Sequence, residues 1–149
     1  MEKTIVMLKP DGLALSLGDT MIERLCEKDL HLLSADLVML TDEAIRKLYK
    51  KYVNQWFFPY ILDYLQEGPC LLTVWEGEDC YEKCREVKGN SYKGTGMRGE
   101  WSSCEVTSEE GETSYIKNVL HVSDPEDFER EYEILSNFII PYEKDERGN

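Results

Sequence analysis

The sequence has little positive charge, few prolines and no long apolar run. Its 149 residues include 17 lysines and arginines against 30 aspartates and glutamates, a formal net charge of -13. This excess of negative charge argues against nucleic acid or an anionic membrane as a main partner, because both would be repelled. A small anionic ligand stays compatible, because a local cluster of lysines and arginines outweighs the global field at short range.

No segment approaches the length of about 20 apolar residues that a membrane-spanning helix needs. The N-terminal MEKTIVMLKPDG also has too short an apolar run for a secretory signal. The five cysteines, an odd number, then predict free thiols in a reducing compartment, and we expect a cytoplasmic protein. Cys80 and Cys84 are four residues apart without clustered histidines, which favours core packing over a zinc site.

Hydrophobic periodicity predicts strands alternating with helices. Two βαβ-like halves around a four-stranded antiparallel sheet covered by helices favour a ferredoxin-like sandwich of the α/β (α+β) class. We expect this domain over residues 1–142 and a polar C-terminal tail over 143–149. Strands are expected over 4–9, 32–40, 70–75 and 115–121. Helices are expected over 19–28, 57–66, 79–87 and 124–138, and from a cap at Thr41 or Asp42 to Tyr52.

Three basic residues stand where a ligand could bind. Lys9 follows the first predicted strand, in the turn-forming sequence KPDG. Arg98 lies between two glycines in a stretch without periodicity, where a guanidinium can fork onto phosphate oxygens. Arg85 lies beside the apolar stripe of a predicted helix. Considered singly, each of them also fits an ordinary surface side chain.

His121 is one of only two histidines and ends the last predicted strand, in the segment NVLHVSDPED. Imidazole titrates near neutrality, so an unprotonated ring nitrogen is available as a nucleophile at physiological pH. Asp124 and Pro125 are typical of the first positions of a helix, whose positive dipole end would point towards His121. The pattern suits a nucleophile beside a bound anion; a histidine merely hydrogen-bonded at a strand end is the alternative.

Six motifs occur in a fixed order along nearly the whole chain. They are KPDG at 9–12, WFFP at 56–59, GPCLLTVWEG at 68–77, Arg85, MRGEW at 97–101 and NVLHVSD at 118–124. In this order and spacing, residues 3–138 resemble nucleoside diphosphate kinases. The resemblance implies ping-pong transfer of the γ-phosphoryl group from a nucleoside triphosphate to a nucleoside diphosphate through a phosphohistidine at His121. It also implies a homo-oligomer, either a hexamer or a tetramer.

The family pattern, carried onto this chain, implies the phosphate ligands. Lys9, Arg85 and Arg98 would contact the phosphates. Ser91 stands where the family usually has threonine and keeps a hydroxyl for a phosphate oxygen. Mg²⁺ would be carried on the phosphates, with Asp124 reaching it at most through water.

The same pattern implies how the nucleoside is held. Phe57 would stack on the base, with Ile61 as the apolar wall beside it, and any base offers a π-face for this contact. Lys9 and Asn118 would hold the sugar hydroxyls. Asn118 and His121 have opposite parity in an ideal strand, so their cooperation requires a bend or a strand that starts after Asn118.

Around the histidine, the pattern puts Tyr49 close to His121. Ser123 and a glutamate on the following helix would orient the imidazole. The local sequence favours Glu133 as that glutamate, with Glu131 as the alternative.

The chain departs from the family pattern in three places. Val122 replaces a glycine, which is costly if that position needs φ > 0 and crowds the pocket if it needs only a small side chain. The chain is shorter than usual between Ser91 and Arg98 and longer between Arg98 and Asn118. The extra piece, around 105–115, is expected to be an acidic hairpin with a turn near Gly111, projecting into solvent; the alternative is a segment that alters subunit contacts or overhangs the nucleotide. These changes support the alternative function, a catalytically weakened nucleotide-binding or regulatory module.

Overall fold

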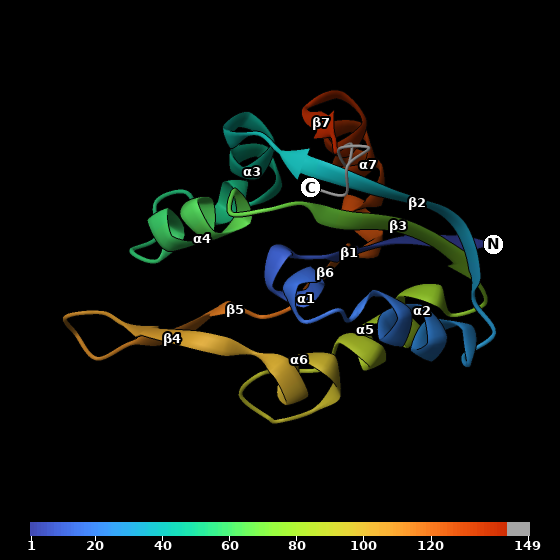
Figure 1. The fold of residues 1–149 in the computed structure, drawn as a ribbon, viewed down its shortest axis with the longest axis horizontal. Coiled ribbons are helices and arrows are strands. Elements are labelled where there is room, and N and C mark those ends of the chain that lie inside the picture. The colour runs from blue at the N-terminus through green and yellow to red at the C-terminus, as the bar shows by residue number, and fades with distance from the viewer. Residues whose placement is uncertain (143–149) are drawn as a thin grey trace, which may run out of the picture.

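Five antiparallel strands form the central sheet, and helices cover both of its faces (Figure 1). The computed structural model describes residues 1–142, so the tail predicted at 143–149 lies outside the described residues. The strand order is β6-β1-β3-β2-β7. The strands are β1 (Glu2–Leu8), β2 (His31–Leu40), β3 (Cys70–Gly77), β6 (Leu120–Val122) and β7 (Ile139–Pro141).

The order β6-β1-β3-β2 is that of a ferredoxin-like sheet, which confirms the predicted fold class. The prediction of four strands misses β7, which pairs with the last three residues of β2. A strand of three residues that ends in Pro141 is too short to show an alternating pattern. The helices are α1 (Pro10–Ala14), α2 (Gly18–Cys26), α3 (Asp42–Leu48), α4 (Phe58–Leu65), α5 (Cys80–Lys88), α6 (Gly96–Trp101) and α7 (Phe128–Asn137), with 3₁₀ turns η1 (Lys50–Tyr52) and η2 (Pro125–Asp127).

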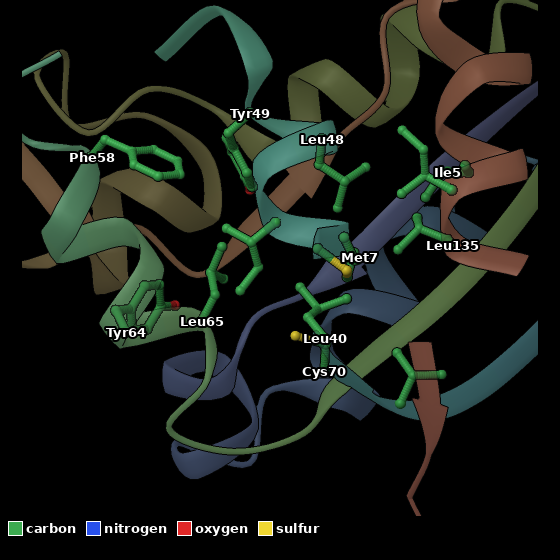
Figure 2. Close-up of a cluster of buried hydrophobic side chains, with 14 of the residues drawn as sticks. Ile5, Met7, Leu40, Leu48, Tyr49, Phe58, Tyr64, Leu65, Cys70 and Leu135 are labelled. Carbon is green, nitrogen blue, oxygen red and sulfur yellow. The ribbon is translucent and has the colours of Figure 1, made fainter. Parts of the chain in front are cut away.

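Strand β1 is buried on both faces and divides the core into two clusters. Ile5 and Met7 belong to the cluster under α3, α4 and α7, shown in Figure 2. Val6 and Leu8 point the other way, into the cluster beneath α2 and α5. This alternation follows from the two-residue period of a strand. The crossover helices α2 and α5 thus share one face, as two βαβ halves require.

The KPDG segment begins a helix, where the sequence favoured a simple turn. Lys9 is the N-cap of α1 and Pro10 its first residue, a position that needs no backbone N–H. Gly12 lets α1 lie close to its neighbours, since a Cβ there would come within 2.5 Å of the Leu8 side chain. The Asp11 carboxylate accepts a hydrogen bond of 3.1 Å from the Val119 backbone N–H. This contact ties the end of the first strand to the segment that carries the histidine.

The last predicted strand, 115–121, is divided into two. Its first part belongs to β5 (Thr113–Lys117), which pairs only with β4 (Ser103–Thr107), and β6 starts at Leu120. Between them Val119 has φ +76° and Leu120 N–H donates to the Asn118 carbonyl at 2.9 Å, which is a γ-turn. A valine in this conformation costs about 1–3 kcal/mol, so the surrounding contacts must hold it. In one regular strand Asn118 and His121 would face opposite sides of the sheet. The bend removes this conflict, because β6 starts after Asn118.

Strands β4 and β5 form the expected acidic hairpin, and Gly111 at its turn has φ +86°. In Figure 1 the hairpin projects beyond the sheet, on the side where α4 lies. Helix α6 precedes it, so Arg98 lies in a short helix and not in the irregular stretch that its two glycines suggested.

All five cysteines are free, as predicted. Cys80 and Cys84 are buried in the core, and residues 1–142 contain no group of three or more candidate ligands for a metal ion. Across the described residues, none of the helices has the length and apolar character needed to cross a membrane.

Candidate active site

A hollow of about 350 Å³ opens where β1 ends and the antiparallel β6 begins, and it is bordered by α4, α6 and α7. Elements far apart in sequence contribute to its wall, which therefore forms only in the folded chain. The residues predicted for the site that line it are Lys9, Tyr49, Phe57, Ile61, Ser91, Arg98, Asn118, His121 and Asp124.

His121 is held on β6 opposite Met7 of β1, and its side chain reaches the pocket. Its Nε2 is hydrogen-bonded to the Glu131 carboxylate of α7, a residue that is only 3% exposed. A carboxylate accepts hydrogen bonds, so Nε2 carries the proton and Nδ1 keeps its lone pair. The imidazole is thus fixed in the tautomer that a nucleophile needs.

The sequence favoured Glu133 as the glutamate that orients His121. The structure corrects this: Glu131, and not Glu133, is hydrogen-bonded to the histidine. Glu133 is exposed on the outer side of α7. The sequence did contain the relevant signal: Glu131 lies three and four residues before Ile134 and Leu135, both of which are buried. Residues at that spacing share one helix face, so Glu131 points inwards and Glu133 does not.

Lys9 is buried at the end of β1, with 5% of its surface exposed. Its ammonium group donates a hydrogen bond of 2.7 Å to the Asn118 side-chain oxygen. Burial, together with the neighbouring positive charge of Arg98, lowers the pKa of Lys9 to about 7, while Asp11 opposes this shift. Lys9 is therefore only partly charged near neutral pH, and a bound anion would raise its pKa and restore the positive charge.

Tyr49 lies beside the histidine, with its ring centroid 5.9 Å from that of His121 in an edge-on arrangement. Burial raises the pKa of its phenol well above the usual value, so the group stays protonated. Among residues 1–142 its hydroxyl has no hydrogen-bond partner. A buried donor without an acceptor is costly in a folded protein, and a ligand oxygen in the pocket would satisfy it.

Arg98 and Ser91 approach from the opposite wall. The Arg98 guanidinium donates to the Leu120 carbonyl from Nη2 at 2.9 Å and Nε at 3.3 Å, which leaves its remaining N–H groups for the pocket. The Ser91 hydroxyl shares a hydrogen bond of 2.6 Å with Ser102. The loop carrying Ser91 begins at Gly89, where φ is +70° and a Cβ would stand 1.9 Å from the Thr95 carbonyl oxygen. Only glycine fits that turn.

The model of the nucleoside diphosphate kinase family matches residues 2–138. The chain belongs to the nucleoside diphosphate kinase family. The "Nucleoside diphosphate kinase" of Symbiobacterium thermophilum is 34% identical over 147 residues, covering 95% of this chain and 91% of that protein. The one from Bacillus licheniformis is 32% identical over 137 residues, covering 91% and 88%.

Solved structures of the family agree with this fold. The nucleoside diphosphate kinase of Encephalitozoon cuniculi has a TM-score of 0.78 at 27% identity, with 90% of this chain and 88% of that chain covered. A halophilic enzyme from Halobacterium salinarum, in complex with CDP, has a TM-score of 0.76 at 25% identity, with 97% and 94% covered.

Two residues that the family pattern suggested, Ser123 and Asp124, have other contacts here. The Ser123 hydroxyl accepts a hydrogen bond of 3.0 Å from Ile5 N–H and thereby joins the chain after β6 to β1; no described contact links it to His121. Asp124 accepts from the Tyr81 hydroxyl at 2.8 Å and does not cap η2 with its side chain. Because a 3₁₀ turn separates Asp124 from α7, no α-helix starts at the position expected from the sequence.

Arg85 does not line the histidine pocket. It is exposed and borders an adjoining hollow, which shares Lys88, Asn90 and Arg98 with that pocket. Sequence reasoning missed Lys88, the last residue of α5, which lines both hollows. Burial and the positive charge of Arg98 together lower the pKa of Lys88 to about 8, while Asp124 opposes this shift. It follows Cys84 by four residues and Gly89 ends its helix, so its position on the inner face was readable from the sequence.

Val122 does not have the backbone problem that its replacement of glycine suggested. It is a regular strand residue paired with Val6, and positive φ occurs at Val119 instead. Its side chain is buried in the core cluster and also borders the pocket. Crowding of the pocket by the Val122 side chain therefore remains open. A strained backbone at Val122 is excluded.

The acidic hairpin is not only a solvated excursion. Ser114, Tyr115 and Ile116 of β5 line the histidine pocket, together with Tyr92 of the preceding loop. The segment that departs from the family pattern therefore forms part of the wall of the site.

Proposed function

We propose that this chain carries out the reaction of its family, nucleoside diphosphate kinase, through His121. The observation that supports it best is the histidine bound at Nε2 by Glu131 in a pocket that is also lined by the buried Lys9 and the partly buried Lys88 and Arg98. Nδ1 attacks the γ-phosphorus of a nucleoside triphosphate, an N–P bond forms, and the bond to the β,γ-bridging oxygen breaks. The nucleoside diphosphate leaves with the electron pair of the broken P–O bond. A second nucleoside diphosphate then attacks the phosphohistidine and reverses these steps.

The cations of the pocket neutralise charge as it moves from the γ-phosphoryl oxygens to the leaving oxygen. Lys9, Arg98 and Lys88 take this role from the pocket wall, and Arg85 reaches the phosphates from the adjoining hollow. The unpartnered Tyr49 hydroxyl donates to a phosphoryl oxygen near His121. Groups already fixed in the fold need no reorganisation during transfer, and for this reason they stabilise the transition state.

The nucleoside lies farther from the histidine. Phe57 stacks on the base, with Ile61 beside it, and the hydrogen-bonded pair Lys9–Asn118 binds the sugar hydroxyls. The Ser91 hydroxyl donates a hydrogen bond to a phosphate oxygen, which replaces its hydrogen bond with Ser102.

The metal that fits this site is one carried by the nucleotide. The described residues contain no group of three candidate ligands, while Asp124 lies at the pocket wall with one oxygen bound to Tyr81. This arrangement fits Mg²⁺ bound to the phosphates, with Asp124 reaching it through water. The ion would neutralise phosphate charge. Loss of transfer on chelation, restored by added Mg²⁺, checks the assignment.

The test of the function is nucleotide exchange. Incubation with Mg²⁺, ATP and GDP is expected to produce GTP and ADP with parallel-line ping-pong kinetics. Nucleotide binding without exchange would support the alternative, a catalytically weakened binding or regulatory module, for which Val122 at the pocket wall is the structural argument.

Replacement of Lys88 by alanine is expected to raise KM for nucleoside diphosphates about 10-fold, because a charge-assisted phosphate contact is lost. Lys93→Ala is the matched control, since Lys93 is exposed and borders only the adjoining hollow. Steady-state kinetics of both variants measure the effect. Equal KM values for the two would show that Lys88 does not contact phosphate.

Nucleotide binding is expected to take up about one proton at pH 8, because an anion favours the charged form of a nearby lysine and raises its pKa. In the free protein at that pH, Lys9, with a pKa of about 7, is largely deprotonated. Lys88, with a pKa of about 8, is half deprotonated. Calorimetry of ADP binding in buffers of different ionisation enthalpy measures the uptake. At pH 6, where both lysines already carry a proton, the uptake should vanish.

We extend the proposal to assembly and location. Exposed apolar side chains on β2 (Leu32, Leu33 and Leu37) support a homo-oligomer, either a hexamer or a tetramer, which light scattering after size exclusion would identify. Five free thiols support a cytoplasmic location, which cell fractionation tests.

A further inference from the structure

The carboxylate of Asp124 is held by Tyr81, a residue of α5 that stands outside the site. The Tyr81 hydroxyl donates a hydrogen bond of 2.8 Å to Asp124 Oδ1. In the structure of residues 1–142, Asp124 lines the histidine pocket, whereas Tyr81 borders neither this pocket nor the adjoining hollow. The bond occupies Oδ1 and leaves Oδ2 as the carboxylate oxygen that can serve a ligand in the pocket.

Tyr81 is itself anchored, both by its ring and by its backbone. The ring packs against the core cluster beneath α2 and α5. The backbone N–H donates to the Glu2 carboxylate of β1, which satisfies a group that the first turn of a helix leaves without a partner. Burial, together with the hydrogen bond to Asp124, raises the pKa of Tyr81 to about 12, so the phenol stays protonated as the donor. A donor fixed in this way determines where the carboxylate lies.

The backbone of Asp124 is also fixed, so its side-chain rotamer is the main freedom that remains. The preceding Ser123 exchanges two hydrogen bonds of 3.0 Å with Ile5, one through its hydroxyl and one through its backbone N–H. After it, the Asp127 N–H donates to the Asp124 carbonyl at 2.9 Å. An aspartate at such a position usually caps the following turn, but the Asp124 side chain makes no capping bond. The bond to Tyr81 has taken its place.

The face of α5 that carries Tyr81 also carries two cations. Tyr81, Arg85 and Lys88 occupy positions i, i+4 and i+7 of the helix and therefore share one face. The negative charge of Asp124 reaches Lys88, whose pKa it raises. A carboxylate released from Tyr81 would thus have Lys88 as an alternative partner. An ion pair between them would withdraw one cation from the phosphates and the carboxylate from its present place.

We propose that Tyr81 is a positioning residue, which holds the Asp124 carboxylate towards the metal ion carried by the nucleotide and away from Lys88. Tyr81 acts only through Asp124, whose free oxygen reaches the ion through water. The inference rests on the proposed function, because that function places Mg²⁺ and phosphates beside Asp124. It predicts that the loss of one hydroxyl changes how strongly Mg²⁺ tightens nucleotide binding, while His121 and Glu131 keep their arrangement.

The experiment measures the Kd of ADP by calorimetry, once with Mg²⁺ and once with a chelator, and compares the two values. Tyr81→Phe keeps the ring and loses the hydroxyl. It is expected to reduce the tightening by Mg²⁺ about 10-fold, the lower end of the effect of removing a group that orients a metal ligand. Asp124→Asn should reduce it at least as much. The double variant should match Asp124→Asn alone, because Tyr81 has no effect once its partner is changed.

Tyr132→Phe is the matched control, since it removes the hydroxyl of an exposed tyrosine on α7. It should leave both Kd values unchanged, and thermal unfolding of each variant reports whether it is folded. Equal Kd changes with and without Mg²⁺ in Tyr81→Phe, or effects that add in the double variant, would show a merely structural role and overturn the inference. An unchanged Tyr81→Phe, or native protein whose ADP binding ignores Mg²⁺, would overturn it as well.

The proposed function fails on a different observation. Native protein that binds ADP more tightly with Mg²⁺ but transfers no phosphoryl group would contradict the kinase. The two Kd values need no transfer, so they would still decide the role of Tyr81.

Discussion

Replacement of His121 by alanine is expected to abolish phosphoryl transfer, with a loss on the order of 10⁴-fold or more, because the only proposed nucleophile is removed. Nucleotide binding should largely survive, since Lys9, Arg98 and Phe57 remain in the pocket. Transfer from ATP to GDP and binding of ADP by calorimetry measure the two quantities separately.

The control for this change is the other histidine. His31 begins β2 and is exposed, far in sequence from the pocket and not part of its lining. His31→Ala should therefore transfer at the native rate. If His121→Ala kept substantial transfer while remaining folded, the covalent route through this residue would be wrong.

Loss of the Glu131 carboxylate is expected to produce the second largest effect. Glu131→Gln should slow phosphorylation of the histidine about 10- to 100-fold, the size of effect seen when a carboxylate that orients a metal-bound imidazole is removed. The neutral amide no longer stabilises positive charge on the ring or fixes its tautomer. Single-turnover labelling by ATP measures the rate without interference from product release.

Glu133→Gln provides the matched comparison, two residues along the same helix. Glu133 is exposed and makes no described contact with His121, so its replacement should leave the rate near the native value. The reverse result, a slow Glu133 variant and a normal Glu131 variant, would restore the assignment that the linear pattern favoured. If both variants were phosphorylated at the native rate, neither carboxylate would orient the nucleophile.

Periodicity predicted the ferredoxin-like layers because β1, β2 and β3 are long and carry clear apolar patterns. It missed elements whose signal is too short or ambiguous. The sequence KPDG fits both a turn and a helix start, since proline suits the first position of each. Burial of the segment against Val119 decides for the helix.

The residues that line the pocket were largely foreseen from the ordered motifs, but their partners were not. A hydrogen bond such as Ser123 to Ile5 depends on which strands become neighbours, and the spacing of residues along the chain does not contain that information. Lys88 was missed because a lysine at a helix end is usually solvated. The hairpin was foreseen as an element, yet its contacts through Trp56 and Tyr92 join parts of the chain brought together only by the fold.

The most direct test of the central claim is the intact mass of the protein after incubation with Mg²⁺ and ATP. A ping-pong kinase is expected to gain one phosphoryl group, which is acid-labile, is removed by a nucleoside diphosphate and is absent in His121→Ala. An unmodified mass, in protein shown separately to bind ATP, would contradict transfer through a phosphohistidine and leave a nucleotide-binding module in its place.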